Sequence, residues 1–140
     1  MKLFQEGDYY GVILNLKGPH VSGISHAERM YWIGISYHKL EEYQNSAKYL
    51  EKAIHHGYRG EGVYYELGQS YYALKSHKKA ISNFLKSIKQ KYQSDNSHYY
   101  LGHIYKEINM RPKAKRYFKL VQESTFPNLN MLQAAHYQMG

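Results

Sequence analysis

Three near-copies of one segment decide the fold: residues 30–40 read MYWIGISYHKL, residues 64–74 read YYELGQSYYAL and residues 98–108 read HYYLGHIYKEI. Each copy begins 34 residues after the one before it. The columns that match are an aliphatic residue before a glycine and a tyrosine three positions after it: Ile33-Gly34, Leu67-Gly68, Leu101-Gly102, and Tyr37, Tyr71, Tyr105. Apolar residues within each copy recur every three or four positions, which is the period of an amphipathic helix. One period held in several columns indicates a repeat protein.

The same interval continues outside these segments and predicts a second helix in every unit. The further columns are Tyr9, Tyr43, His77 and Arg111; Ser46, Ala80 and Ala114; and Leu50, Phe84 and Phe118. Glycine or proline interrupts the pattern between units, as expected where one helix stops and the next starts. We therefore expect eight helices, near residues 4–17, 24–39, 43–56, 60–74, 77–90, 95–108, 111–124 and 129–139.

These columns resemble those of the tetratricopeptide repeat family. The family pattern of a large residue, Leu-Gly, Tyr, Ala, Phe and Ala is matched three times, with Met30, Tyr64 and His98 at the usual tryptophan and with Pro127 as the one closing proline. The resemblance implies an all-α fold, namely a right-handed superhelical solenoid of antiparallel helix pairs with about three full repeats plus flanking helices. In such a solenoid each unit buries its apolar face against its neighbours.

The chain is interpreted as a single domain over residues 1–140. Its expected parts are the second helix of a partial repeat, three repeats, and a partial repeat or capping helix: residues 1–23, 27–60, 61–94, 95–127 and 128–140. The incomplete units at both ends favour a fragment of a longer protein of this family. A complete small protein with degenerate ends is the alternative.

Composition excludes several classes of function. The 140 residues contain no cysteine, which excludes disulfides, thiolate zinc sites and cysteine nucleophiles. No apolar run is long enough to cross a membrane and no secretory signal opens the chain, so we expect a cytoplasmic protein. The nine histidines show no i, i+4 pairing on a helical face, and neither a nucleophile elbow nor a phosphate-cradling glycine loop is present. We therefore predict no catalytic residues, no metal and no cofactor.

A helical wheel of the first helix of each unit separates the side needed for stacking from a side that is not constrained. In tetratricopeptide repeat proteins the unconstrained side resembles the inner wall of the superhelix, where partner peptides lie. Here that side is rich in tyrosine, which suits binding hot spots. For any one tyrosine, the alternative is that it fills the interior of a thin solenoid. The predicted groove residues are Tyr31, Ile35, His38, Tyr65, Gln69, Tyr72, Asn96, Tyr99, His103 and Lys106.

Positive charge is concentrated on the second helices. The formal net charge is +8, and the second helices carry most of the lysine and arginine: Lys78, Lys79, Lys86, Lys89, Lys113, Lys115, Arg116 and Lys119. We interpret this outer surface as a solvated face that keeps the chain soluble. Binding of nucleic acid or of an anionic surface is the alternative, and a lack of interleaved aromatic residues argues against it.

The function that these features favour is a protein–protein interaction scaffold or adaptor, which holds a partner's peptide or helix in the concave groove. The alternative is a structural solenoid that assembles into homo-oligomers by stacking its open ends. The resemblance also implies an exclusion. Chaperone-binding repeat domains grip a C-terminal carboxylate with Lys, Asn and Arg, and none of these residues is retained at the matching positions Tyr31, Ile35, Glu66, Asn96 and Tyr100. Heat-shock chaperone tails are therefore not the expected partners.

Overall fold

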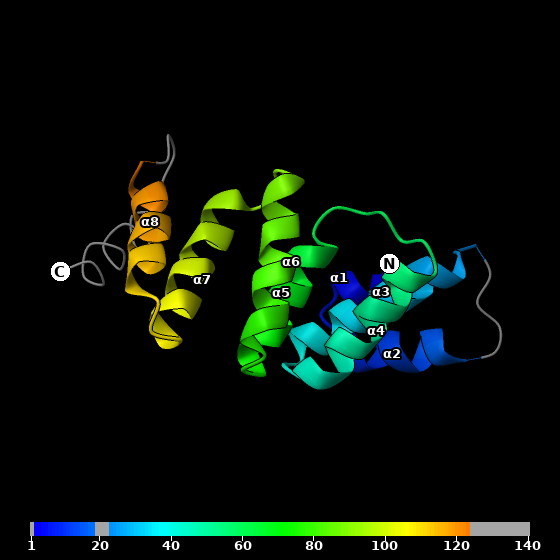
Figure 1. The fold of residues 1–140 in the computed structure, drawn as a ribbon. Coiled ribbons are helices and arrows are strands. Elements are labelled where there is room, and N and C mark those ends of the chain that lie inside the picture. The colour runs from blue at the N-terminus through cyan, green and yellow to red at the C-terminus, as the bar shows by residue number, and fades with distance from the viewer. Residues whose placement is uncertain (1, 19–22, 124–140) are drawn as a thin grey trace.

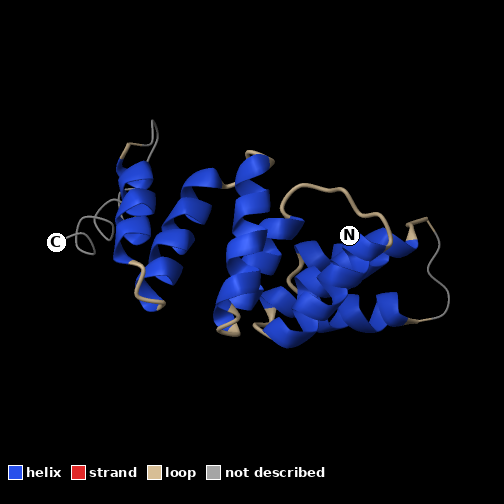
Figure 2. Ribbon diagram, in the orientation of Figure 1, coloured by secondary structure: helices blue, strands red, loops and turns tan. Residues whose placement is uncertain are grey.

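The fold was analysed in a computed structural model, which describes residues 2–18 and 23–123. These residues form helices and no strand (Figure 2). The helices are α1 Lys2–Gln5, α2 Tyr9–Lys17, α3 His26–Lys39, α4 Tyr43–His55, α5 Val63–Ala73, α6 His77–Lys89, α7 Ser94–Glu107 and α8 Arg111–Gln122. The helix expected at 129–139 and the closing Pro127 lie outside the described residues. None of the helices in the described part of the chain is both long and apolar enough to cross a bilayer.

Consecutive helices pair and the pairs stack. Within the pairs, α3 packs on α4, α5 on α6, and α7 on α8, while α2 with α3, α4 with α5, and α6 with α7 join one pair to the next. Short turns within each pair make its helices antiparallel. The pairs succeed one another along the molecule from blue α1–α4 to orange α8 (Figure 1). The predicted all-α solenoid of helix pairs is confirmed.

The 34-residue period also appears in the backbone conformation. The turn inside each pair contains a residue with positive φ, and these residues are Gly7, Glu41, Lys75 and Asn109, with φ of 80°, 60°, 62° and 64°. In each turn the next N–H donates to a carbonyl near the end of the preceding helix: Asp8 to Leu3, Glu42 to Tyr37, Ser76 to Tyr71 and Met110 to Tyr105, at 2.7–2.9 Å. This left-handed C-terminal cap satisfies a carbonyl that the helix leaves without a partner.

The first part of the chain differs from the sequence expectation. Residues 4–17 were expected to form one helix, but Gly7 divides them into α1 and α2. The N-cap of α2 is Asp8, whose Oδ1 accepts a 2.9 Å hydrogen bond from the Gly11 N–H. Because α1 ends at Gln5, 34 residues before the end of α3, it stands in the place of the last turn of a first helix. A repeating turn, rather than a continuous helix, therefore begins the solenoid.

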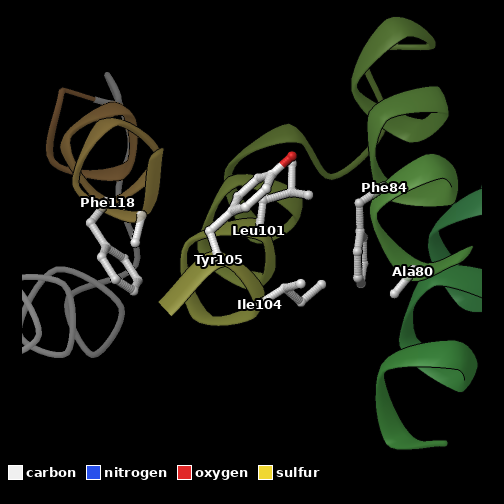
Figure 3. Packing of buried hydrophobic residues seen from close by; sticks show 7 residues of the cluster. Ala80, Phe84, Leu101, Ile104, Tyr105 and Phe118 are labelled. Atoms are coloured by element: carbon white, nitrogen blue, oxygen red, sulfur yellow. The ribbon is translucent and has the colours of Figure 1, made fainter. Parts of the chain in front are cut away.

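Large side chains from the second helices fill the interior. Leu50, Phe84 and Phe118 are at most 1% exposed and are spaced by the repeat period. Figure 3 shows one such cluster, in which Phe84 of α6 and Phe118 of α8 lie on opposite sides of Leu101 and Ile104 of α7. Burial of these apolar side chains between successive helices supplies the main stabilisation of the stack.

The glycine column allows this packing. We expected Gly34, Gly68 and Gly102 to face the small residues of the second helix, and Ser46 Oγ does donate a buried 2.8 Å hydrogen bond to the Gly34 carbonyl. The closest obstacles to an added β-carbon, however, are the large side chains: Leu50 at 2.8 Å, Phe84 at 2.8 Å and Phe118 at 2.6 Å. The missing side chain therefore makes room for the large residue of the partner helix.

Candidate peptide-binding site

A pocket of about 300 Å³ lies between α3 and α5. We call it the α3–α5 pocket, and its lining residues are Ile35, His38, Lys39, Tyr65, Glu66, Gln69 and Tyr92. Four of the ten predicted groove residues are therefore brought together here: Ile35, His38, Tyr65 and Gln69. We call the side of α3, α5 and α7 that carries the ten predicted residues the first-helix face.

Ile35 belongs to the interior as well as to the pocket. It is 5% exposed and packs in a core cluster with Leu50, Val63 and Leu67. The sequence analysis placed it on the unconstrained side, but the neighbouring pair α5–α6 covers much of that position. Ile35 can thus offer a partner only a small apolar surface.

The tyrosine column Tyr31, Tyr65 and Tyr99 is held by ring contacts inside the solenoid. The Tyr31 ring stacks on Tyr58, with centroids 4.2 Å apart. Tyr65 meets Phe84 edge-on at 5.9 Å, and Tyr99 meets Phe118 edge-on at 6.3 Å. All three are partly buried. Each ring therefore contributes to packing, which the sequence analysis gave as the alternative, and fixes the position of what remains exposed.

Hydrogen bonds hold two of the predicted polar residues. Gln69 Nε2 donates to the Tyr100 hydroxyl at 3.2 Å, which joins α5 to α7. The Tyr72 hydroxyl donates to Glu107 Oε1 at 3.0 Å, and Glu107 Oε2 lies 2.8 Å from His77 Nε2. Burial, followed by this contact with Glu107, raises the pKa of Tyr72 to about 12. The Tyr72 hydroxyl therefore already takes part in a contact between repeats.

The two predicted histidines each have a buried ring nitrogen without a hydrogen-bond partner. These atoms are His38 Nε2, beside the α3–α5 pocket, and His103 Nε2, on α7. Burial lowers the pKa of both imidazoles, so both are neutral at neutral pH. The His103 ring also packs edge-on against Tyr99, with centroids 4.5 Å apart. A buried polar atom without a partner is costly unless a ligand satisfies it.

The remaining predicted residues lie on α7 and do not line the α3–α5 pocket. Asn96 Nδ2 donates to Gln93 Oε1 at the start of α7, and Asn96 also hydrogen-bonds Tyr65. Lys106 is exposed. Along with Tyr99 and His103, these residues extend the first-helix face by one repeat beyond the pocket.

The sequence analysis missed Lys39, Glu66 and Tyr92 as site residues. Glu66 is mostly buried, and its Oε2 has no hydrogen-bond partner. Burial raises the pKa of this carboxyl to about 8, against smaller lowering effects of the Lys39 charge and a polar contact with Tyr31. The helical wheel placed position 66 at the border of the unconstrained side, and an acid among large neighbours was the signal that could have identified it.

The outer surface has more aromatic content than the sequence analysis assumed. The eight basic residues of the second helices named above are all exposed. The ammonium groups of Lys79, Lys86 and Lys113 lie 5.2–5.3 Å from the ring centroids of Tyr71, Tyr64 and Tyr105, respectively. The expected lack of interleaved aromatics is therefore wrong, and several of these lysines make cation–π contacts with the solenoid's own rings.

The comparisons with known proteins agree with this architecture. A family model of the tetratricopeptide repeat matches residues 27–54 and 62–93. Among solved structures, "MamA MSR-1 C2" is similar with a TM-score of 0.68 at 19% sequence identity, over 84% of this chain and 68% of that chain. At this identity the likeness shows the fold alone. A comparison with curated proteins found no match. Repeat period, helix pairing and family model together show that the chain belongs to the tetratricopeptide repeat family.

Proposed function

We propose that the chain is a protein-interaction scaffold that binds a peptide or helical segment of a partner along the first-helix face. The membership in a repeat family whose proteins generally bind other proteins supports this role. The observation that carries it is the α3–α5 pocket, because residues chosen for their position on the unconstrained side line a pocket.

The packing of the tyrosines suits such a role. Tyr31, Tyr65 and Tyr99 are held by Tyr58, Phe84 and Phe118, so a partner would meet side chains that are already ordered. Preorganised anchors reduce the entropy that binding must otherwise overcome. The buried nitrogens of His38 and His103 are groups that a partner's polar atoms would satisfy.

A peptide display library panned against the purified chain tests the proposal. We expect enriched peptides whose binding is weakened at least tenfold by Gln69→Arg, which places a long side chain in the pocket. Gln44→Arg is the matched control, because Gln44 is exposed on the second helix α4. Enriched peptides that bind both variants equally, or a folded chain that enriches none, would contradict the proposal.

Self-assembly is a second candidate, favoured by exposed apolar side chains on α2. Leu14 is 76% exposed and Tyr10 is 60% exposed. Exposed apolar surface on a solenoid is a surface on which a second copy can stack. Sedimentation over a concentration series decides this candidate: a constant monomer mass contradicts it, and a mass that falls in Leu14→Glu supports it.

Binding of an anionic partner is a third candidate, favoured by a basic pocket of about 480 Å³ between α2, α3 and α4. Its lining includes six cationic or imidazole side chains and no acidic one: Lys17, His26, Arg29, Lys52, His55 and His56. Binding of a nucleic acid there would weaken steeply with salt. Titration with single-stranded RNA at low and at physiological ionic strength tests it, and no binding at low salt would eliminate it.

A further inference from the structure

The α3–α5 pocket exists at the one place where a repeat column changes from an aromatic residue to an acid. The column contains Trp32, Glu66 and Tyr100, each 34 residues apart. The Trp32 ring packs against Phe4 at 5.0 Å, and the Tyr100 ring stacks on Phe84 at 4.8 Å. Glu66 has no ring with which to fill the equivalent space in the middle repeat. The smaller side chain therefore leaves room beside a carboxyl group.

A buried acid here is costly to the fold. Burial disfavours the charged carboxylate, and Glu66 Oε2 has no hydrogen-bond partner in the described residues to offset this cost. The first and third repeats show that an aromatic ring fits the column. A polar group that reduces stability without forming its own contacts is characteristic of a binding site.

The surroundings of Glu66 are suited to a cation. The tyrosine rings of Tyr65 and Tyr92 line the same pocket, and their centroids are 6.1 Å apart. Aromatic faces attract cations, and a carboxylate with a vacant lone pair accepts a hydrogen bond from an ammonium or guanidinium donor. The pocket volume of about 300 Å³ is at the lower end for ligand sites, which matches one long side chain rather than a whole small molecule.

We propose that the α3–α5 pocket binds a cationic side chain of the partner segment, with the Glu66 carboxylate as its counter-ion and the Tyr65 and Tyr92 rings beside its alkyl stem. The inference rests on the proposed function and specifies the chemistry of the partner. Lysine and arginine share this chemistry, and the experiment below distinguishes them. Gln69 and the neutral His38 supply polar atoms at the same pocket.

Binding of a cation is coupled to loss of a proton from Glu66. With the pocket empty, burial raises the pKa of Glu66 to about 8, so most of the carboxyl is protonated at pH 7. The titratable groups that face it are Tyr31, His38 and Lys39 of α3, Tyr58 before α5, Tyr65 of α5 and Tyr92 before α7. Lys39 alone among them is cationic at neutral pH, and it lies exposed. A cation that binds only the ionised form should therefore bind about tenfold more tightly at pH 9 than at pH 7.

Methyl NMR of Ile35 can test the proposal directly, because Ile35 lines the pocket and methyl signals persist at high pH. The probes are acetylated and amidated pentapeptides with lysine, arginine or norleucine between glycine and alanine residues. We expect saturable shifts of the Ile35 methyl signal with the lysine peptide, the arginine peptide or both. Norleucine, which retains the alkyl chain without the charge, should bind at least tenfold more weakly.

Two variants complete the experiment. Glu66→Gln keeps the shape of the side chain and should weaken cation binding at least tenfold and remove its dependence on pH. Glu61→Gln makes the same change at an exposed acid and should leave binding unaltered. Equal affinity for norleucine and lysine peptides, or unchanged affinity in Glu66→Gln, would overturn the cation pocket while leaving peptide binding intact. No Ile35 shift with peptides at tens of millimolar would also overturn it, and the display experiment would still decide the proposed function.

Discussion

Gly68 of α5 lies against the Phe84 ring of α6 so closely that a β-carbon at Gly68 would be 2.8 Å from Phe84 Cδ1. The same relationship recurs one repeat earlier with Leu50 and one repeat later with Phe118. The distance between the two helices of a pair is therefore set by the absence of a side chain on one of them and the presence of a large one on the other.

Gly68→Ala should destabilise the chain by about 1–3 kcal/mol because the added methyl group overpacks a fully buried ring. Helix propensity alone predicts the opposite, a gain of up to about 1 kcal/mol. Urea unfolding gives the sign. Gly18→Ala is the control, since a β-carbon there meets nothing closer than 3.4 Å. A more stable Gly68→Ala variant would show that the helix pair is less tightly packed than described.

Glu66→Gln should stabilise the chain increasingly as the pH rises. The pKa of Glu66 is about 8 in the folded state against the ordinary 4.5, so between these values the folded chain holds a proton that the unfolded chain has released. The free energy of unfolding of the wild type therefore falls as the pH rises through this window. By pH 9 the variant should be more stable by at least about 1 kcal/mol, since each pKa unit corresponds to about 1.4 kcal/mol. Parallel pH profiles for the two proteins would contradict the burial of this carboxyl.

Glu107→Gln should cost up to about 1 kcal/mol above pH 5 and nothing in strong acid. Burial alone would raise the pKa of Glu107, but the hydrogen bonds with His77 and Tyr72 outweigh burial and lower it. A lowered pKa adds stability that is lost as the pH falls through that pKa. The side chain is exposed enough for water to weaken the effect. A double-mutant cycle with Tyr72→Phe measures the coupling, and no coupling would show that this link between repeats is not formed in solution.

Glu41→Gly should stabilise the chain by up to about 1 kcal/mol. Glu41 has φ of 60° at a turn where Gly7 occupies the equivalent place in the unit before. Left-handed backbone costs a residue with a β-carbon about 1–2 kcal/mol, part of which the greater flexibility of glycine cancels in the unfolded chain. Glu41→Gln separates this effect from removal of the charge at the end of α3. Gly7→Ala should change stability in the opposite direction, and thermal melting of the three variants checks the pattern.

The fold could be predicted from the sequence because the period fixes many positions at once. The columns Tyr9, Tyr43, His77 and Arg111 coincide with the first residues of α2, α4, α6 and α8. The break at Gly7 was missed because a glycine in a short N-terminal segment was read as part of a helix, although its spacing from Glu41 was the turn signal.

The candidate site could be predicted only in part, because a helical wheel gives the direction of a side chain but not its neighbours. It selected Tyr65 and Gln69 correctly as pocket residues, and it could not show that Ile35 is covered by the next repeat. Tyr92 escaped because it lies in the connection before α7, outside any helix used for the wheel. Glu66 escaped because its importance depends on burial, which arises only when the repeats stack.

Amide chemical-shift mapping of an enriched display peptide on the isotope-labelled chain tests most directly the claim that partners bind the first-helix face. The account predicts shifts that concentrate on α3, α5 and α7, with the largest near His38, Tyr65 and Gln69. Shifts that concentrate instead on α4, α6 and α8 would contradict it.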